Sequence, residues 1–153
     1  MNSNILEIKN LKTSFFTHIG EVEAVRGVSL SIKKGETLGI VGESGSGKSV
    51  TLMSILQLIQ YPGKIKSGEI IFENEDLLKK SPKQLMKIRG NKIAMIFQDP
   101  MSSLNPVFRI GNQIVETIRT HQNISLKDAR KRAVELLKMV GIPSPEKRLN
   151  NYP

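Results

Sequence analysis

The sequence predicts an α/β protein built around a phosphate-binding loop, and three observations support this fold class. Short apolar runs with the composition of strands alternate with longer segments whose apolar residues recur at helical spacing. Residues 42–49 match the pattern G-x-x-x-x-G-K-S and lie between such a run and such a segment. The chain has 153 residues, 39% of them hydrophobic, which suits one packed domain. Strands with interposed helices are typical of α/β folds.

The first third of the chain is expected to be mostly strand. Residues 5–16 indicate one or two strands, and residues 28–32, which alternate apolar and polar side chains, indicate another. A turn at residues 33–36 leads into residues 37–41, a short, β-branched apolar run that predicts a buried strand. Residues 50–59 place leucine and isoleucine at helical spacing and predict a helix.

The remaining elements are bounded by local signals. Residues 61–63 (Tyr-Pro-Gly) end the helical pattern, and residues 68–72 predict a strand. Ser81 and Gln84 have the spacing of a capping box, with a proline at the first helical position, so a helix is expected to about Arg89.

Two helices and a loop are expected in the C-terminal third. Isoleucine at every fourth position over residues 110–118 predicts one helix. Ser125 should cap a second helix, which Gly141 should end, and residues 142–153, with three prolines, should be loop. The inward face of the second helix is expected to consist of Leu126, Ala129, Ala133, Leu136, Leu137 and Val140.

Residues 42–49 have a physical reason to bind phosphate. Glycines at positions 42, 45 and 47 permit backbone conformations that a Cβ forbids, so successive N–H groups can turn toward one anion. The following helix adds unpaired N–H groups and the positive end of its dipole. Lys48 should reach the β- and γ-phosphates, and the Ser49 hydroxyl should bind Mg²⁺. The candidate nucleotide-binding residues of the loop are Gly42, Glu43, Ser44, Gly45, Ser46, Gly47, Lys48, Ser49 and Val50.

Two other interpretations of this segment explain less. A plain glycine-rich turn does not account for a Lys-Ser pair, rather than a usual cap residue, at the start of the helix. A dinucleotide-binding loop needs a third glycine where this chain has Val50.

Composition limits the partners. The net charge of +9 fits nucleic acid, an anionic membrane face or an anionic ligand. Much of this charge falls in residues 79–89 and 127–132, where solvated helix faces are the simplest explanation. No aromatic residue lies among these charges to stack on bases, so nucleic acid is not expected. The chain has no cysteine, no signal peptide and no apolar run near the roughly 20 residues that span a bilayer, so we expect an intracellular protein that is not itself transmembrane.

Residues 93–97 predict a second buried strand, and Gln98 follows it directly. Polar side chains just past the carboxyl end of a buried strand are where ligand sites of α/β proteins gather. A glutamine there can orient a water molecule or complete a Mg²⁺ shell without adding negative charge beside phosphate. Taken alone, a Gln-Asp-Pro turn is commonplace.

The phosphate loop, taken together with residues 98–106 (Gln-Asp-Pro-Met-Ser-Ser-Leu-Asn-Pro), resembles the ATP-binding subunits of ABC transporters. Residues 39–44, the string from Phe97 to Pro106 and the closing residues 151–153 are similar to the branch that imports oligopeptides, dipeptides and nickel. The resemblance implies an ABC-type P-loop NTPase fold with an N-terminal antiparallel β-subdomain and the start of a helical subdomain.

The same resemblance implies a division of the chain and a role for one glutamine. Residues 1–100 would be the ATP-binding core with the β-subdomain, and residues 101–153 the Q-loop with the beginning of the helical subdomain. Gln98 would be the Q-loop glutamine, a catalytic residue that contacts the attacking water and shares Mg²⁺ with Ser49. The implied ligands are ATP and Mg²⁺.

The implied function is that of an ABC-type ATPase that drives uptake of oligopeptides or dipeptides, or of nickel, across the cytoplasmic membrane. Its partners would be transmembrane permease subunits, a second ATP-binding subunit and, indirectly, an extracytoplasmic solute-binding protein. The chain would lie peripherally at the cytoplasmic face of the membrane. An alternative is a non-hydrolysing nucleotide-binding fragment that docks on membrane subunits through residues 98–106.

Three motifs of that family are absent from the sequence: a Leu-Ser-Gly-Gly signature, a strand ending in Asp-Glu and a later histidine that senses the γ-phosphate. We therefore expect the N-terminal half of a nucleotide-binding domain, which binds ATP without hydrolysing it and folds marginally. Apolar neighbours of the missing strand should be uncovered. His18 and His121 are expected to be ordinary surface histidines.

One aromatic side chain completes the expected site. The family often stacks adenine on an aromatic residue that precedes the phosphate loop. Phe16 is the residue we expect in this role, with Phe15 and Ile19 beside it. A core position for the two phenylalanines is the alternative.

Overall fold

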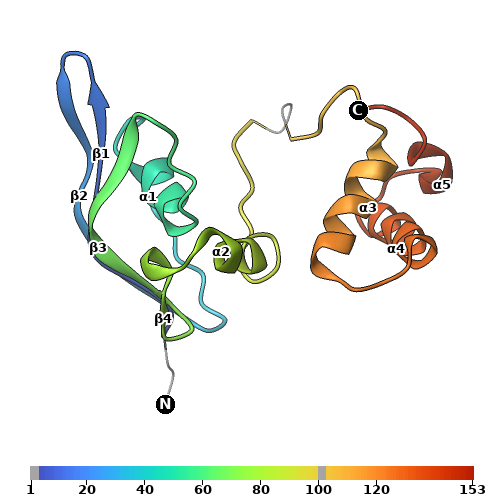
Figure 1. The fold of residues 1–153 in the computed structure, drawn as a ribbon, viewed down its shortest axis with the longest axis horizontal. Coiled ribbons are helices and arrows are strands. Elements are labelled where there is room, and N and C mark those ends of the chain that lie inside the picture. Colours follow the sequence, from blue (N-terminus) through green and yellow to red (C-terminus); the bar gives the residue numbers. More distant parts are fainter. Residues whose placement is uncertain (1–3, 100–102) are drawn as a thin grey trace. The chain divides into compact units, whose positions relative to one another are not determined.

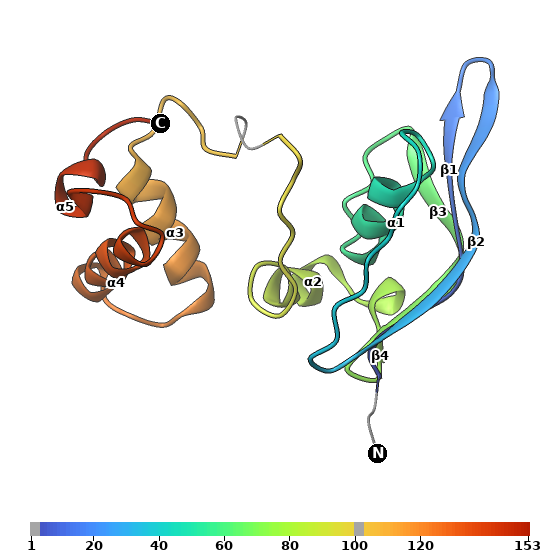
Figure 2. The ribbon, with the colours of Figure 1, turned by 180° about the vertical axis from the view of Figure 1, so that it is seen from behind.

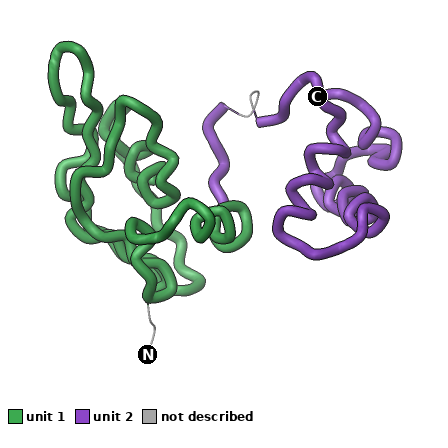
Figure 3. Tube along the Cα trace, viewed as in Figure 1, with its two compact units in different colours: residues 1–93 green, residues 94–153 purple. Residues whose placement is uncertain are grey.

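The computed structural model describes residues 4–99 and 103–153. They form two compact units, residues 1–93 and 94–153, and each is described by itself (Figure 3). Three residues of the predicted loop, Pro100, Met101 and Ser102, lie outside the described residues. Among the described residues, no helix combines the length and the apolar content needed to cross a bilayer.

The first unit is built on one antiparallel sheet with the strand order β2-β1-β3-β4. The three predicted strands are confirmed, but two of them begin earlier than expected, because residues 20–26 and 63–67 also pair with β1. The pair Thr17–Gly20 closes the hairpin between the first two strands. The strands are β1 (Asn4–Thr17), β2 (Gly20–Lys33), β3 (Gly63–Phe72) and β4 (Glu75–Asp76).

Helices cover one face of this sheet (Figures 1 and 2). They are α1 (Lys48–Ile55), the 3₁₀ turn η1 (Leu77–Lys79) and α2 (Pro82–Ile88). The predicted capping box at the start of α2 is confirmed: Ser81 Oγ accepts from the Gln84 N–H, and Gln84 Oε1 accepts from the Ser81 N–H at 2.8 Å. Helix α1 is shorter than predicted, because Gln57 takes the left-handed conformation (φ 50°) and ends it.

The core of the first unit lies between the sheet and these helices. Its fully buried apolar side chains include Ile8, Leu11, Ile70 and Leu77, with Ile55 from α1 packed against them. One polar contact crosses this core: Thr13 Oγ1 of β1 lies 3.0 Å from Ser54 Oγ of α1, and both residues are fully buried. A buried hydrogen bond is costly to leave unmade, so this contact fixes α1 against the sheet.

Two strand predictions were wrong. Residues 37–41 and 93–97 are extended, but apart from an isolated bridge between Arg89 and Ile93 they have no sheet partner in the described parts of the chain. Val41 and Ile96 are 94% and 96% exposed, respectively. An apolar run becomes a strand only where a neighbouring strand accepts its backbone hydrogen bonds. The exposure agrees with the expectation that apolar residues would be left uncovered.

The second unit is a small helical cluster of α3 (Ile110–His121), α4 (Leu126–Met139) and α5 (Pro145–Arg148). The expected helices α3 and α4 are confirmed, and Gly141 (φ 76°) follows the end of α4 as predicted. The expected C-terminal loop is corrected by α5. Ala129 and Ala133 are buried against α3, but Leu126 and Val140, at the two ends of α4, are exposed rather than inward.

Candidate functional site

The glycine-rich loop leads directly into α1, and its last glycine is the N-cap of that helix. Gly45 and Gly47 have φ values of 80° and 90°, in the left-handed region that glycine tolerates best. A Cβ built on Gly47 would overlap the carbonyl oxygen of Ala24 on β2. The loop therefore lies directly against the sheet at a point where only glycine fits.

The Lys48 side chain folds back into the loop. Its Nζ donates to the carbonyl oxygens of Gly42 at 2.7 Å and Glu43 at 2.6 Å, and lies 3.3 Å from Ser46 Oγ. Two charge-assisted hydrogen bonds to main-chain oxygens hold the ammonium group within the ring of the loop. This arrangement places one fixed positive charge beside loop residues 42–46, all of which are exposed.

The start of α1 supplies donors. Thr51 is the residue whose N–H closes the first turn, onto the Gly47 carbonyl at 2.8 Å. The N–H groups of Lys48, Ser49 and Val50 precede it and have no acceptor within the helix. The Ser49 hydroxyl is exposed on this first turn, whereas Val50 packs against the core.

These residues fit an anionic ligand with a hydroxyl-bound cation. The left-handed glycines form a cradle that a Cβ would fill, and the donors of the helix start meet the Lys48 ammonium there. A cavity of about 530 Å³ adjoins the loop and is large enough for a nucleoside. It is lined by β2 from Val22 to Val28 and by Gly45, Ser46 and Thr51.

Gln98 lies in the second unit, in the extended segment that precedes α3, and its side chain is exposed. The structure thus brings the residues of the phosphate loop together in one unit and places Gln98 in the other. Gln113 of α3 is a residue that sequence reasoning missed. It braces the chain after Gln98: its Oε1 accepts from the Asn105 N–H at 2.8 Å, and its Nε2 donates to the carbonyls of Asn105 and Phe108 at 3.0 Å.

Phe16 and Phe15 lie on opposite faces of β1. Thr13 faces α1 through its contact with Ser54, and side chains alternate along a strand, so Phe15 shares that face and Phe16 does not. The Phe16 ring is 44% exposed and has Lys66 Nζ 5.9 Å from its centroid. The stacking role of Phe16 stays a prediction.

Beside Phe16, Glu21 and Lys66 form an ion pair at 2.8 Å. The hydrogen bond from Lys66 lowers the pKa of Glu21 below its ordinary value, and the same bond raises the pKa of Lys66. His18 lies in the turn between β1 and β2, and His121 is the last residue of α3. Within residues 4–99 and 103–153, no cluster of three or more His, Cys, Asp or Glu side chains is arranged to hold a metal ion.

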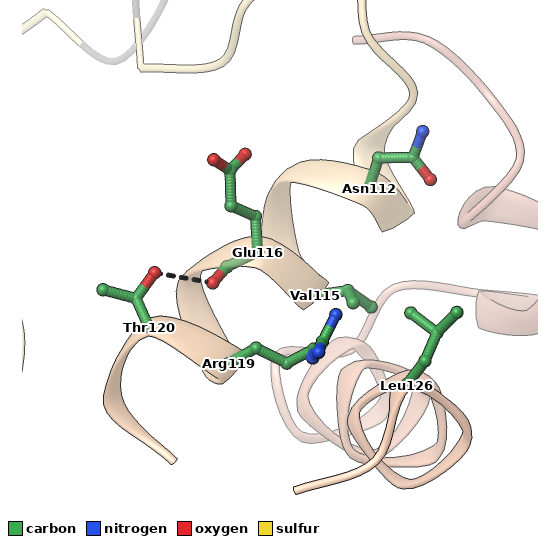
Figure 4. Close-up of a pocket in the computed structure, with 6 residues that line it drawn as sticks. All are labelled: Asn112, Val115, Glu116, Arg119, Thr120 and Leu126. Carbon is green, nitrogen blue, oxygen red and sulfur yellow. Dashed lines mark hydrogen bonds between the residues drawn. The ribbon is translucent and has the colours of Figure 1, made fainter. Parts of the chain in front are cut away.

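A second cavity, of about 480 Å³, lies between α3 and the start of α4 (Figure 4). Val115 and Leu126 give it an apolar side, and Arg119 points toward them. Thr120 is tied to its own helix by a hydrogen bond to the Glu116 carbonyl at 2.9 Å. None of the residues predicted from the sequence lines this cavity, so it is not part of the candidate site.

Comparison with known protein families gives one match over most of the chain. The profile of the family described as ABC transporter matches residues 25–153. The oligopeptide transport ATP-binding protein OppD of Bacillus subtilis is 56% identical over 99% of this chain and 42% of its own length. The dipeptide transport ATP-binding protein DppD of Lactococcus lactis is 50% identical over 97% of this chain and 43% of its own length. The chain thus spans less than half the length of these curated relatives.

Solved structures agree on the fold. The ATP-binding cassette MJ0796, in a dimeric post-hydrolysis state bound to ADP and Pi, is 28% identical with a TM-score of 0.79. That match covers 97% of this chain and 61% of the cassette. The protein cbiO1 of Clostridium perfringens, part of an ABC transporter complex, has a TM-score of 0.64 at 28% identity, over 92% of this chain and 51% of its own.

Proposed function

The chain belongs to the ABC transporter family, and from this premise we propose that it binds Mg-ATP at residues 42–50. Membership of the family implies nucleotide binding. The observation that carries the site is the geometry at Gly47 and Lys48. A left-handed glycine against β2 starts the helix, and the ammonium group is fixed inside the loop.

Each residue of the loop has a defined contribution in this proposal. Gly42, Gly45 and Gly47 let the backbone N–H groups from Glu43 to Val50 converge on the phosphates. Lys48 exchanges its carbonyl partners for β- and γ-phosphate oxygens, and the Ser49 hydroxyl holds Mg²⁺. When bound, Mg²⁺ neutralises charge on the phosphate oxygens. Ser44 and Ser46 add hydroxyl donors at the rim.

We assign Gln98 to the same nucleotide as a second Mg²⁺ ligand that also orients the attacking water. The family relationship supports this role, and the exposed amide at the end of the 93–97 segment is compatible with it. In this proposal, residues 1–100 form the ATP-binding core with the β-subdomain. Residues 101–153 form the Q-loop and the beginning of the helical subdomain, close to the boundary between the two compact units at residue 93.

At the level of the whole protein, we propose an ATPase that powers uptake of oligopeptides or dipeptides. The names of the relatives, oligopeptide and dipeptide transport ATP-binding proteins, support this substrate class over nickel. The partners would be transmembrane permease subunits and a second ATP-binding subunit, with a solute-binding protein acting through them. The proposed location is the cytoplasmic face of the cell membrane.

A second candidate function is nucleotide binding without turnover. It is favoured by one observation on the 153-residue chain, the absence of an Asp-Glu strand end and of a Leu-Ser-Gly-Gly signature from its sequence. An acid that activates water is needed for hydrolysis, whereas binding needs the loop alone.

Calorimetric titration with Mg-ATP, with phosphate release followed in parallel, tests both functions. We expect the 153-residue chain to bind Mg-ATP and release no phosphate. Lys48→Ala should weaken binding by at least about 100-fold, because a charge-assisted contact to phosphate is removed. Lys34→Ala, which removes an exposed lysine from a turn of the same unit, is the matched control and should bind like the parent.

Three outcomes would change the assignment. Equal affinity of Lys48→Ala and the parent would move the nucleotide away from this loop. Steady phosphate release that Lys48→Ala abolishes would rule out the binding-only function for this chain. A parent that binds neither Mg-ATP nor Mg-GTP would contradict the proposed site.

A further inference from the structure

The C-terminal end of α1 is closed by two sets of hydrogen bonds, which matters because the other end of this helix is the proposed phosphate site. A helix leaves its last carbonyl groups without partners. Here the Gln57 N–H donates to the Ser54 carbonyl at 3.0 Å, and the Leu58 N–H donates to the Met53 carbonyl at 2.9 Å. This is a Schellman motif in which a non-glycine residue, Gln57, takes the left-handed position (φ 50°).

The second set comes from Arg89, at the end of α2. Its Nε donates to the Leu56 carbonyl at 2.8 Å, and its Nη2 donates to the Gln57 carbonyl at 2.9 Å. The rigid guanidinium fork thus bridges the two carbonyls that follow the Schellman motif, and its positive charge faces the negative end of the helix dipole. Arg89 is half-buried, so water competes weakly for these bonds.

Gln57 ties the same end of α1 to a third element. Its Nε2 donates to the Leu77 carbonyl of η1 at 2.6 Å. The end of the phosphate-loop helix is therefore joined by side chains to η1 and to α2, 20 and 32 residues away in the sequence.

The backbone after Arg89 forms a tight turn. The Gly90 N–H donates to the Ile93 carbonyl at 2.8 Å, and the N–H groups of Lys92 and Ile93 donate to the Ile88 carbonyl at 2.8 and 3.1 Å. Arg89 and Ile93 also form the isolated bridge described above. This turn is continuous in sequence with the extended segment that ends at Gln98.

We propose that Arg89 is a positioning residue that couples the phosphate-loop helix to the segment carrying Gln98. Phosphate at the start of α1 and Arg89 at its end act on one rigid helix of eight residues, so a shift of the helix is transmitted to the turn at residues 90–93. Arg89 touches neither the nucleotide nor the reacting atoms. The inference rests on the proposed function, because it assigns the loop and Gln98 to the same ligand.

The experiment compares Arg89→Gln and Arg89→Lys with a matched control, Lys87→Gln, which removes an exposed charge from the last turn of α2. Mg-ATP affinity is measured by calorimetry, and amide hydrogen exchange of residues 90–98 is measured with and without Mg-ATP. Arg89→Gln should raise Kd about tenfold, because a fork to two carbonyls is lost. It should also abolish the nucleotide-dependent protection of residues 90–98.

Arg89→Lys should restore part of both effects, since it keeps the charge but not the fork, and Lys87→Gln should match the parent. A residue that only stabilises the fold would lower Tm and leave the nucleotide-dependent protection intact below Tm. That result, or an unchanged Kd in Arg89→Gln, would overturn the inference while the parent still binds. If Arg89→Gln does not fold, an Arg89→Lys variant identical to the parent in Kd and in protection overturns it. Failure of the parent to bind would instead overturn the proposed function, and this inference with it.

Discussion

Gly47 and Lys48 are neighbours that support the phosphate loop by different physical means. Gly47 matters for what it lacks, since its backbone has a left-handed φ and a Cβ would overlap the Ala24 carbonyl. Lys48 matters for the charge that it carries, which the carbonyls of Gly42 and Glu43 hold in place. Shape at one residue and charge at the next explain why the motif requires both.

The stacking role of Phe16 leads to a prediction for single residues. If Phe16 stacks on the base, Phe16→Ala should raise Kd for Mg-ATP about tenfold, because one stacked base contributes about 1–3 kcal/mol. Mg-GTP should respond equally, since stacking tolerates any base. Phe15→Ala is the matched control from the opposite face of β1, and calorimetry gives all four affinities. If Phe15→Ala weakens binding and Phe16→Ala does not, the role belongs to Phe15.

A second prediction for single residues concerns the Glu21–Lys66 pair. The pKa of Glu21 is lowered from 4.5, so its stabilising effect is present above pH 4.5 and is lost as pH falls through the lower, folded-state pKa. The pKa of Lys66 is raised from 10.5, so its effect is present below pH 10.5 and is lost as pH rises through the higher value. The Tm difference between the parent and Lys66→Gln should therefore be constant from about pH 5 to pH 10 and shrink at both extremes. A difference that peaks near neutral pH would contradict this linkage.

At the scale of secondary structure, α1 is fixed at both ends and in the middle. Gly47 places its start against β2, Ser54 joins it to Thr13, and Arg89 closes its end. A helix of eight residues is too short to be stable alone, so these tertiary contacts decide its position. The phosphate site therefore depends on contacts with the sheet and with α2 as much as on its own residues.

Two glycines of the loop provide a test of this dependence. Gly47→Ala should lower the free energy of unfolding by more than about 2 kcal/mol, because left-handed strain is combined with a backbone clash. Gly45→Ala has the same kind of φ, but its Cβ would meet no described atom within 4 Å, so it should cost only about 1 kcal/mol. Urea denaturation measures both values. Equal losses would show that β2 does not press on the loop as described.

Local signals explain which elements could be predicted from the sequence. The capping box at Ser81, the glycines of the loop and the glycine after α4 act on their immediate neighbours, so their positions alone identified these elements. Residues 37–41 and 93–97 were misassigned, because strand formation depends on a partner that a local pattern does not contain. Gln113 and Arg89 were missed for the same reason: each binds carbonyls or N–H groups that only the tertiary fold brings near.

At the scale of the whole chain, the two units have separate cores. Ile70 belongs to the core under the sheet, and Ile118 belongs to the core between α3 and α4. The two side chains share no buried neighbours, so their effects on stability should be independent.

This separation predicts independent unfolding. Ile70→Ala should lower the free energy of unfolding of the first unit by about 2–5 kcal/mol, and Ile118→Ala should do the same for the second. Amide hydrogen exchange, resolved by residue, should show loss of protection confined to the mutated unit. Loss of protection in both units after either substitution would mean that they unfold as one cooperative body.

The uncovered segment 37–41 has a consequence for the behaviour of the chain in solution. It is extended, uncharged and rich in β-branched residues, which are the properties of backbone that pairs with other molecules. It also ends at Val41, immediately before the first glycine of the phosphate loop. Self-association and nucleotide thus compete for adjoining stretches of the same backbone. Mg-ATP would then act as a solubilising agent for this chain, because a ligand that binds the monomer draws the equilibrium away from the associated form.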